Sequence, residues 1–175
     1  NETKKKCGVQ PSTLISHFQK LSQLKGEFQS RYTELCEKLK QLENSKCFNE
    51  LDSFITESEI SKAISHLKCN KSSGLDNISN NMIKNGQTFL LKSFQQMFNT
   101  CLSSGIYPTS WAEGYITPIF KSNDTSDPNN YRGITITSAI GKLFNRILSL
   151  RLDKFLQEHN IIHDSQIGFT RKART

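Results

Sequence analysis

The chain has 175 residues, of which 35% are hydrophobic and 22% charged, and its formal net charge is +7. This composition supports a medium-sized domain with a hydrophobic core and argues against intrinsic disorder. No run of about 18 consecutive apolar residues occurs, so we expect no membrane partner. The five cysteines form no CxxC pair, which predicts free thiols in an intracellular, reducing compartment.

The basic excess lies in residues 1–50 and 121–175, whereas acidic and basic side chains balance in residues 51–120. Basic domains bind nucleic acid because lysine and arginine neutralise phosphates and release counterions. The charge is therefore compatible with a nucleic-acid partner but does not by itself favour one over a merely basic surface.

Apolar residues recur at steps of three and four from Leu14 to Leu42, which predicts one long helix or a helical hairpin. Ser12 or Thr13 is the expected N-cap, and Gly26 is a candidate break. The pattern also fits a coiled coil, but a helical segment flanking a globular domain is the preferred interpretation.

Thr56 and Glu59 have the spacing of a capping box and predict a short helix directly after them. Its expected apolar face is Ile60, Ala63, Ile64 and Leu67. After a loop rich in Ser, Asn and Gly, the helical pattern resumes near Asn80 and is expected to stop at Gly105. The long helix there has one broad apolar face, made of Phe89, Leu90, Phe94, Met97, Phe98, Cys101 and Leu102.

Alternating β-branched residues on both sides of a turn-rich connection predict a β-hairpin over about residues 115–136. Pro118 assigns the first strand to a sheet edge or a bulge. Ser138 then opens a helix whose expected core stripe is Ile140, Leu143, Phe144, Ile147, Leu148, Leu152 and Phe155. The predicted fold is α+β and mostly helical, with one β-hairpin and several helices.

Lys121 ends the first hairpin strand and Arg132 begins the second. In a paired hairpin the two cations approach one another and can clamp phosphate oxygens, with the guanidinium adding its fork geometry. Without further context, two ordinary surface charges are the preferred interpretation.

The loop "KCNKSSGLDN" combines lysines, hydroxyls and a glycine, which can bind phosphates, but taken alone a plain interhelical loop is the preferred interpretation. Neither a P-loop, a GxSxG elbow nor an HExxH motif occurs. His159 and His163 lie four residues apart, but the helix is expected to end between them, so no metal site is predicted.

Several stretches, in this order, resemble motifs of the non-LTR (LINE-type) retrotransposon reverse transcriptases. They are "AISHLKCNKSSGLDNIS", "GIYPTSWAEGYITPIFKSNDTSDPNNYRGITITSAIGKLFNRILSLRL" and "SQIGFTRKART". The resemblance runs from about Ile55 to Thr175 and implies the fingers subdomain of a right-hand polymerase. Residues 1–50 would be a helical connector, and residues 51–175 a partial reverse transcriptase domain without palm or thumb.

The resemblance also implies site residues. Lys121 and Arg132 match the positions that bind the triphosphate of the incoming dNTP, and Tyr131 and Ile134 would support that strand. Arg146 and Arg151, on the basic helix behind the hairpin, would face the template backbone or solvent. The implied template-binding residues are Lys71, Ser72, Ser73, Gly74, Asp76, Ile78, Gln166, Gly168, Phe169, Arg171 and Arg174.

The chain departs from the family pattern in three respects. Gly133 stands where proline is usual, and Asn77 stands where glycine is usual. The sequence also has no Asp-Asp pair, whereas the family binds two Mg²⁺ ions with palm aspartates. The chain is therefore expected to be a fragment that stops before the palm motifs, is not catalytic alone and holds no metal. Mg²⁺ would belong to the full-length enzyme.

The partners implied by the resemblance are an RNA template, an RNA–DNA or DNA primer, and dNTP. Two other functions stay open: a non-catalytic nucleic-acid-binding module, and a helical interaction protein driven by the Leu14–Leu42 stripe. Exposed apolar faces on the helices over residues 80–104 and 138–156 would favour self-association.

Overall fold

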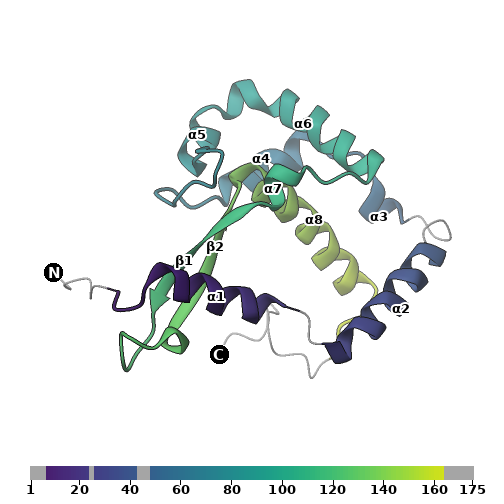
Figure 1. Ribbon diagram of the computed structural model, residues 1–175. Coiled ribbons are helices and arrows are strands. Elements are labelled where there is room, and N and C mark those ends of the chain that lie inside the picture. The colour runs from purple at the N-terminus through teal and green to yellow at the C-terminus, as the bar shows by residue number, and fades with distance from the viewer. Residues whose placement is uncertain (1–6, 24–25, 43–47, 164–175) are drawn as a thin grey trace. The chain divides into compact units, whose positions relative to one another are not determined.

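The computed structural model describes residues 7–23, 26–42 and 48–163. Over these ranges the elements are α1 (Pro11–Ser22), α2 (Gly26–Leu42), α3 (Asn49–Asp52), α4 (Glu57–Ser65), α5 (Asn80–Asn85), α6 (Gln87–Ser104), α7 (Thr109–Ala112), β1 (Gly114–Phe120), the 3-10 turn η1 (Pro128–Asn130), β2 (Tyr131–Thr137) and α8 (Ala139–Glu158) (Figure 1). The described part is mostly helical with one antiparallel hairpin, which confirms the predicted α+β fold.

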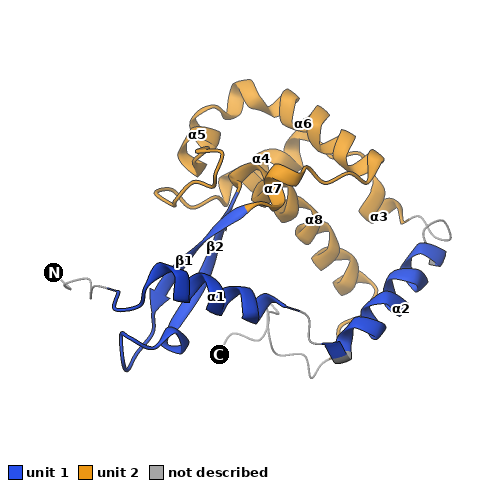
Figure 2. Cartoon of the chain, in the orientation of Figure 1, with its two compact units in different colours: residues 1–47, 114–137 blue, residues 48–113, 138–175 orange. Residues whose placement is uncertain are grey.

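The chain forms two compact units (Figure 2). Unit 1 comprises residues 1–47 and 114–137, and unit 2 comprises residues 48–113 and 138–175. The division near residue 50 rests on the organisation of the family and stays a prediction.

In unit 1, α1 packs on one face of the hairpin. Pro11 occupies the first turn of α1, where its missing N–H costs nothing. The expected cap at Ser12 or Thr13 is wrong, because the helix already begins at Pro11. The small core beneath α1 contains Val9, Leu14, Phe18, Phe120 and Tyr131.

The hairpin strands pair residue for residue, from Gly114 opposite Thr137 to Phe120 opposite Tyr131. Just past the strands, the Lys121 N–H donates to the Asn130 carbonyl at 2.8 Å. In an antiparallel ladder, residues bonded to the partner strand alternate with residues whose N–H and C=O point away from it. Because Lys121 is bonded across the hairpin, Pro118, three residues earlier, lies at a position whose backbone groups point away from β2. Pro118 therefore removes no ladder hydrogen bond, and no bulge is needed to fit it.

The predicted Leu14–Leu42 helical run is two helices, because α2 begins at Gly26. Within α2 the apolar stripe stays on the surface: Phe28, Tyr32, Leu35 and Leu39 are each more than half exposed. Within α1, Leu14 and Phe18 of this stripe pack in the small core, whereas Leu21 is exposed like the part of the stripe in α2.

Unit 2 is built around α4, which contacts both α6 and α8. The predicted capping box is present, with Thr56 and Glu59 exchanging hydrogen bonds at the start of α4. Ser138 caps α8, and Gly105 ends α6 in the left-handed conformation at φ 67°, both as predicted. The largest fully buried hydrophobic side chains of this core are Ile55, Ile60, Ile64, Ile83, Phe98, Leu143 and Ile147.

Two residues assigned to the core stripes are on the surface. Phe89 is 86% exposed, because it lies in the first turn of α6 on the side away from the core, and Leu152 is 47% exposed. The short helices α3 and α7 were not predicted. Trp111 from α7 fills the core beside Phe98 and Phe144, with ring centroids 6.0 and 5.9 Å away.

No helix in the described part of the chain has the length and apolarity needed to cross a membrane. The described cysteines Cys7, Cys36, Cys69 and Cys101 are free thiols.

Candidate functional site

The hairpin places Lys121 and Arg132 on one face. Arg132 lies directly opposite Ile119, and Lys121 is two residues beyond Ile119 on the same side of the ladder. Such diagonal neighbours lie about 7–8 Å apart. Both side chains are exposed, on the face opposite the one that α1 covers. The two cations can therefore reach a single polyphosphate.

Neither cation is engaged by an acid among the residues that the structure describes. The nearby carboxylates of Asp124 and Asp127 instead accept hydrogen bonds within the turn between the strands. Asp124 accepts hydrogen bonds from the Ser126 hydroxyl and N–H at 2.6 and 2.9 Å, which lower the pKa of the Asp124 carboxyl. Asp127 accepts from the N–H and the side-chain amide of Asn129.

The same turn is tied to the strand ends that carry the cations. The Tyr131 hydroxyl donates to the Thr125 carbonyl at 2.8 Å, and the Asn130 amide donates to the Asp124 carbonyl at 3.0 Å. Tyr131, one of the two residues expected to support the strand, is buried under α1, whereas the other, Ile134, is half exposed on the face of Arg132.

Residues 68–79 form a second candidate region, in unit 2, anchored to α5 through asparagines. The Asn80 amide donates to the Lys68 carbonyl at 2.8 Å. Asn81 accepts from the Asn70 N–H and donates to the Asn70 side-chain oxygen, each at 3.1 Å. The start of α5 thus fixes the path of this loop.

A tight turn inside the loop explains one departure from the family pattern. The Asn77 N–H donates to the Gly74 carbonyl at 3.1 Å, and Asn77 itself has φ 56°. Glycine favours this left-handed conformation, and asparagine is among the few other residues that tolerate it. The Asp76 carboxylate accepts from the Ile78 N–H at 3.0 Å, so part of its role is to hold the turn.

The loop exposes some of its expected template-binding residues and buries others. Lys71, Ser72 and Asp76 are exposed, Ser73 and Ile78 are half-buried, and Gly74 is buried. The hairpin cations belong to unit 1 and this loop to unit 2. The remaining predicted residues, Gln166, Gly168, Phe169, Arg171 and Arg174, lie outside the described residues.

Arg151 corrects an expectation, because it faces neither a template nor solvent. It is 9% exposed and makes a two-pronged contact with the Glu59 carboxylate, at 2.7 and 3.0 Å. The same guanidinium donates to the backbone carbonyls of Leu51, Ser53 and Phe54. No local pattern signals this role, since its partners lie far away in the sequence. On the same helix, Lys142 is exposed and Arg146 half-buried.

The contact with Arg151 contributes to a lowered pKa of the Glu59 carboxyl. Burial by itself raises the pKa of Glu59, but the hydrogen bonds from Arg151 and Thr56 and the charge of Arg151 together outweigh burial and lower it. Glu59 thus joins the capping box of α4 to α8.

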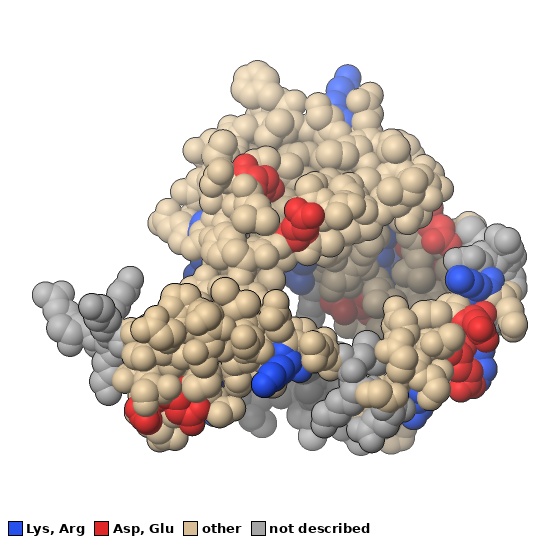
Figure 3. All heavy atoms as spheres, viewed as in Figure 1, with Lys and Arg blue, Asp and Glu red and all other residues tan. Residues whose placement is uncertain are grey.

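The described residues gather no group of three His, Cys, Asp or Glu side chains that could hold a metal ion. Within neither unit does the face drawn in Figure 3 collect lysine and arginine into one continuous patch. On this face, any phosphate contacts would therefore be made by individual cations and not by one broad basic patch.

No family model matches the chain. It is 31% identical over 112 residues to a probable RNA-directed DNA polymerase from transposon BS of Drosophila melanogaster, covering 63% of this chain and 12% of that protein. It is 36% identical over 85 residues to a retrovirus-related Pol polyprotein from the type-1 retrotransposable element R2 of Popillia japonica, covering 49% and 11%. It is 28% identical over 118 residues to the RNA-directed DNA polymerase from mobile element jockey of Drosophila melanogaster, covering 67% and 13%. The chain thus spans between 11% and 13% of the length of these relatives.

Proposed function

This chain is related to the RNA-directed DNA polymerases of non-LTR retrotransposons, and we propose that it is the part of such an enzyme that holds nucleotide and template. Lys121 and Arg132 bind the triphosphate of the incoming dNTP. The loop over residues 71–78 lies against the RNA template. The proposal assigns binding, and not catalysis, to these residues.

The observation that carries the proposal is the register of the hairpin. It presents Lys121 and Arg132 together on an exposed face, with no acid paired to either among the described residues. A guanidinium can donate two parallel N–H bonds to phosphate oxygens, and an ammonium adds a compact charge beside it. This pairing suits a chain of phosphates better than a single carboxylate.

In the loop, the exposed Lys71 and Ser72 would contact the template backbone, since such contacts position a nucleic acid without reading its bases. Gln166, Gly168, Phe169, Arg171 and Arg174 remain part of the proposal through their resemblance to the family motif. The primer, an RNA–DNA or DNA strand, and the Mg²⁺ of the full-length enzyme also belong to the proposal. The residues proposed to bind dNTP and template are assigned no metal-binding role.

The test is a charge reversal of both hairpin cations, Lys121→Glu with Arg132→Glu, in the full chain. Binding of Mg²⁺–dNTP is measured by equilibrium dialysis, and binding of a labelled RNA oligonucleotide by fluorescence anisotropy. We expect dNTP binding to be lost and RNA binding to weaken less, because the loop that contacts RNA is unchanged.

The matched control is Lys20→Glu with Arg31→Glu, which changes the net charge equally at exposed positions of unit 1 outside the hairpin. An equal loss of dNTP binding in the control would show that the loss follows from the change in net charge and not from these two positions, and would contradict the proposal. A loss of RNA binding with unchanged dNTP binding would favour the non-catalytic nucleic-acid-binding module.

One observation favours self-association as a second function. The stripe of α2, formed by Phe28, Tyr32, Leu35 and Leu39, repeats at the heptad spacing of a coiled-coil seam and is exposed. Most of the faces first expected to drive association, in α6 and α8, are instead buried in unit 2. In sedimentation experiments, Leu35→Glu with Leu39→Glu should reduce any dimer, whereas Phe89→Glu should not. The reverse result would exclude the stripe.

A further inference from the structure

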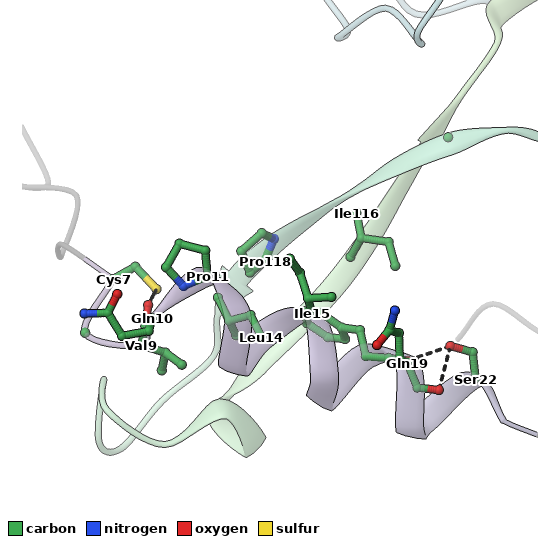
Figure 4. Close-up of a pocket in the computed structure, with 13 residues that line it drawn as sticks. Cys7, Val9, Gln10, Pro11, Leu14, Ile15, Gln19, Ser22, Ile116 and Pro118 are labelled. Atoms are coloured by element: carbon green, nitrogen blue, oxygen red, sulfur yellow. Dashed lines mark hydrogen bonds between the residues drawn. The ribbon is translucent and has the colours of Figure 1, made fainter.

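An apolar groove of about 860 Å³ runs between α1 and β1, entirely within unit 1 (Figure 4). Leu14, Ile15 and Phe18 line it from α1, and Gly114, Ile116 and Pro118 line it from β1. None of the lining residues comes from β2. The groove therefore lies on the β1 side of α1, toward the edge of the sheet that β2 does not occupy.

The backbone along this edge is left open by the hairpin. Because the Lys121 N–H bonds to the Asn130 carbonyl, the ladder bonds of β1 come from its odd-numbered residues. The N–H and C=O groups of Gly114 and Ile116, and the carbonyl of Pro118, point away from β2 instead. These are the same β1 residues whose side chains, or Cα in the case of Gly114, line the groove.

We propose that this groove binds an extended peptide segment of a partner protein, which adds to β1 as a third strand. An apolar groove and a row of open backbone groups lie side by side here, and together they fit an extended chain better than a helix or a compact ligand. Among the described residues no further strand pairs with this edge, and a two-stranded hairpin alone is marginally stable, so a third strand would stabilise the sheet.

The groove defines the chemistry of the partner segment. Residues of an extended chain alternate between the two faces, so every second side chain would enter the groove and should be apolar and preferably β-branched. Pro118 offers no N–H, so pairing runs beside Gly114 and Ile116 and weakens at Pro118. A short edge of this kind limits the docked segment to a few residues and blocks open-ended strand addition.

The test starts from a display library of random heptapeptides selected on the full chain. Selected peptides should alternate apolar with polar residues. The strongest of them is synthesised, labelled, and titrated with the chain and with two variants. Ile116→Pro removes a backbone N–H that points to the open edge beside the groove, and Thr135→Pro removes one that points to the opposite edge. Thr135 is the direct cross-strand partner of Ile116, so the two changes are matched.

We expect Ile116→Pro to weaken peptide binding about tenfold or more, since it removes a hydrogen bond and apolar contact, and Thr135→Pro to leave it unchanged. Loss only in Thr135→Pro would place the peptide on β2 and overturn the proposal. The absence of alternation among the selected peptides would overturn it as well.

A second pair of variants covers the case in which both proline changes disturb the hairpin. Ile15 and Leu21 are both exposed on α1, but only Ile15 lines the groove. Ile15→Glu should abolish binding and Leu21→Glu should not. If both or neither of these variants lose the peptide, the groove is not the docking site.

Discussion

The guanidinium of Arg151 satisfies the carbonyls of Leu51, Ser53 and Phe54 as well as the Glu59 carboxylate. Arg151→Ala would remove this donor from the three carbonyls and leave the Glu59 carboxylate with its hydrogen bonds from Thr56. We predict that it lowers the free energy of unfolding by about 2–4 kcal/mol, since Glu59 keeps some solvent access. Urea denaturation of the full chain measures this loss.

Arg151→Lys should recover little of that stability, because an ammonium cannot reproduce the planar fork. Lys154→Ala, an exposed change one turn later on α8, is the control and should shift the free energy of unfolding by less than about 0.5 kcal/mol. Equal effects of Arg151→Ala and Lys154→Ala would show that the buried contact contributes nothing.

The Arg151–Glu59 contact also predicts a pH dependence. The pKa of Glu59 is lower in the folded chain than its ordinary value of 4.5. A depressed carboxyl pKa stabilises the fold above the ordinary value, and that contribution is lost as the pH falls through the folded value. The stability difference between the wild type and Arg151→Ala should therefore shrink between about pH 6 and about pH 3. A constant difference across that range would contradict the assigned ion pair.

At the scale of elements, Gly133 allows α1 to lie close to the hairpin. A Cβ at this position would sit 2.8 Å from Ile116 Cγ2 and 2.9 Å from Phe18 Cε1. Gly133→Ala should therefore lower the free energy of unfolding by about 1–3 kcal/mol through overpacking. Phe18→Leu in the same chain should recover part of that loss, because it removes the crowding ring edge.

Gly26→Ala is the matched control, since a Cβ there meets nothing within 4 Å. Thermal or urea denaturation compares the three variants with the wild type. If Gly133→Ala is as neutral as Gly26→Ala, α1 does not pack on the hairpin as described.

Sequence patterns predicted those elements whose signals are local. The capping box at Thr56, the cap at Ser138, the stop at Gly105 and the hairpin each depend on a few neighbouring residues. Periodicity assigned Phe89 to the core wrongly, because it shows which face of a helix is apolar and not where the packing partner ends.

The candidate site likewise has features that local sequence patterns predict and features that they do not. The pairing of Lys121 and Arg132 on one face follows from strand alternation and register, which the sequence indicates. The burial of Arg151 does not, because its acceptors lie in α4 and in the segment before α4, far from it in the sequence. Asn77 is partly predictable. Asparagine is known to tolerate the left-handed conformation, but only the structure shows that the turn places Asn77 in it.

At the scale of the whole molecule, the net charge of +7 predicts salt-dependent binding to RNA. The logarithm of the affinity should fall linearly with the logarithm of the salt concentration. Removing Lys71 with Lys71→Ala should lower the magnitude of the slope by about one, as for a single lost phosphate contact. Lys154→Ala, far from the loop in sequence, should leave the slope unchanged. Anisotropy titrations at several salt concentrations give both slopes, and identical slopes would remove Lys71 from the template contact.

The central claim is that Lys121 and Arg132 bind one triphosphate together. The most direct measurement is a titration of the isotope-labelled full chain with Mg²⁺–dNTP, followed through the side-chain NMR signals of arginine and lysine. We predict that the Arg132 and Lys121 signals shift with one shared dissociation constant, while those of Arg146 and Lys20 stay in place. Shifts spread equally over all four side chains, or absent from Arg132 and Lys121, would contradict the claim.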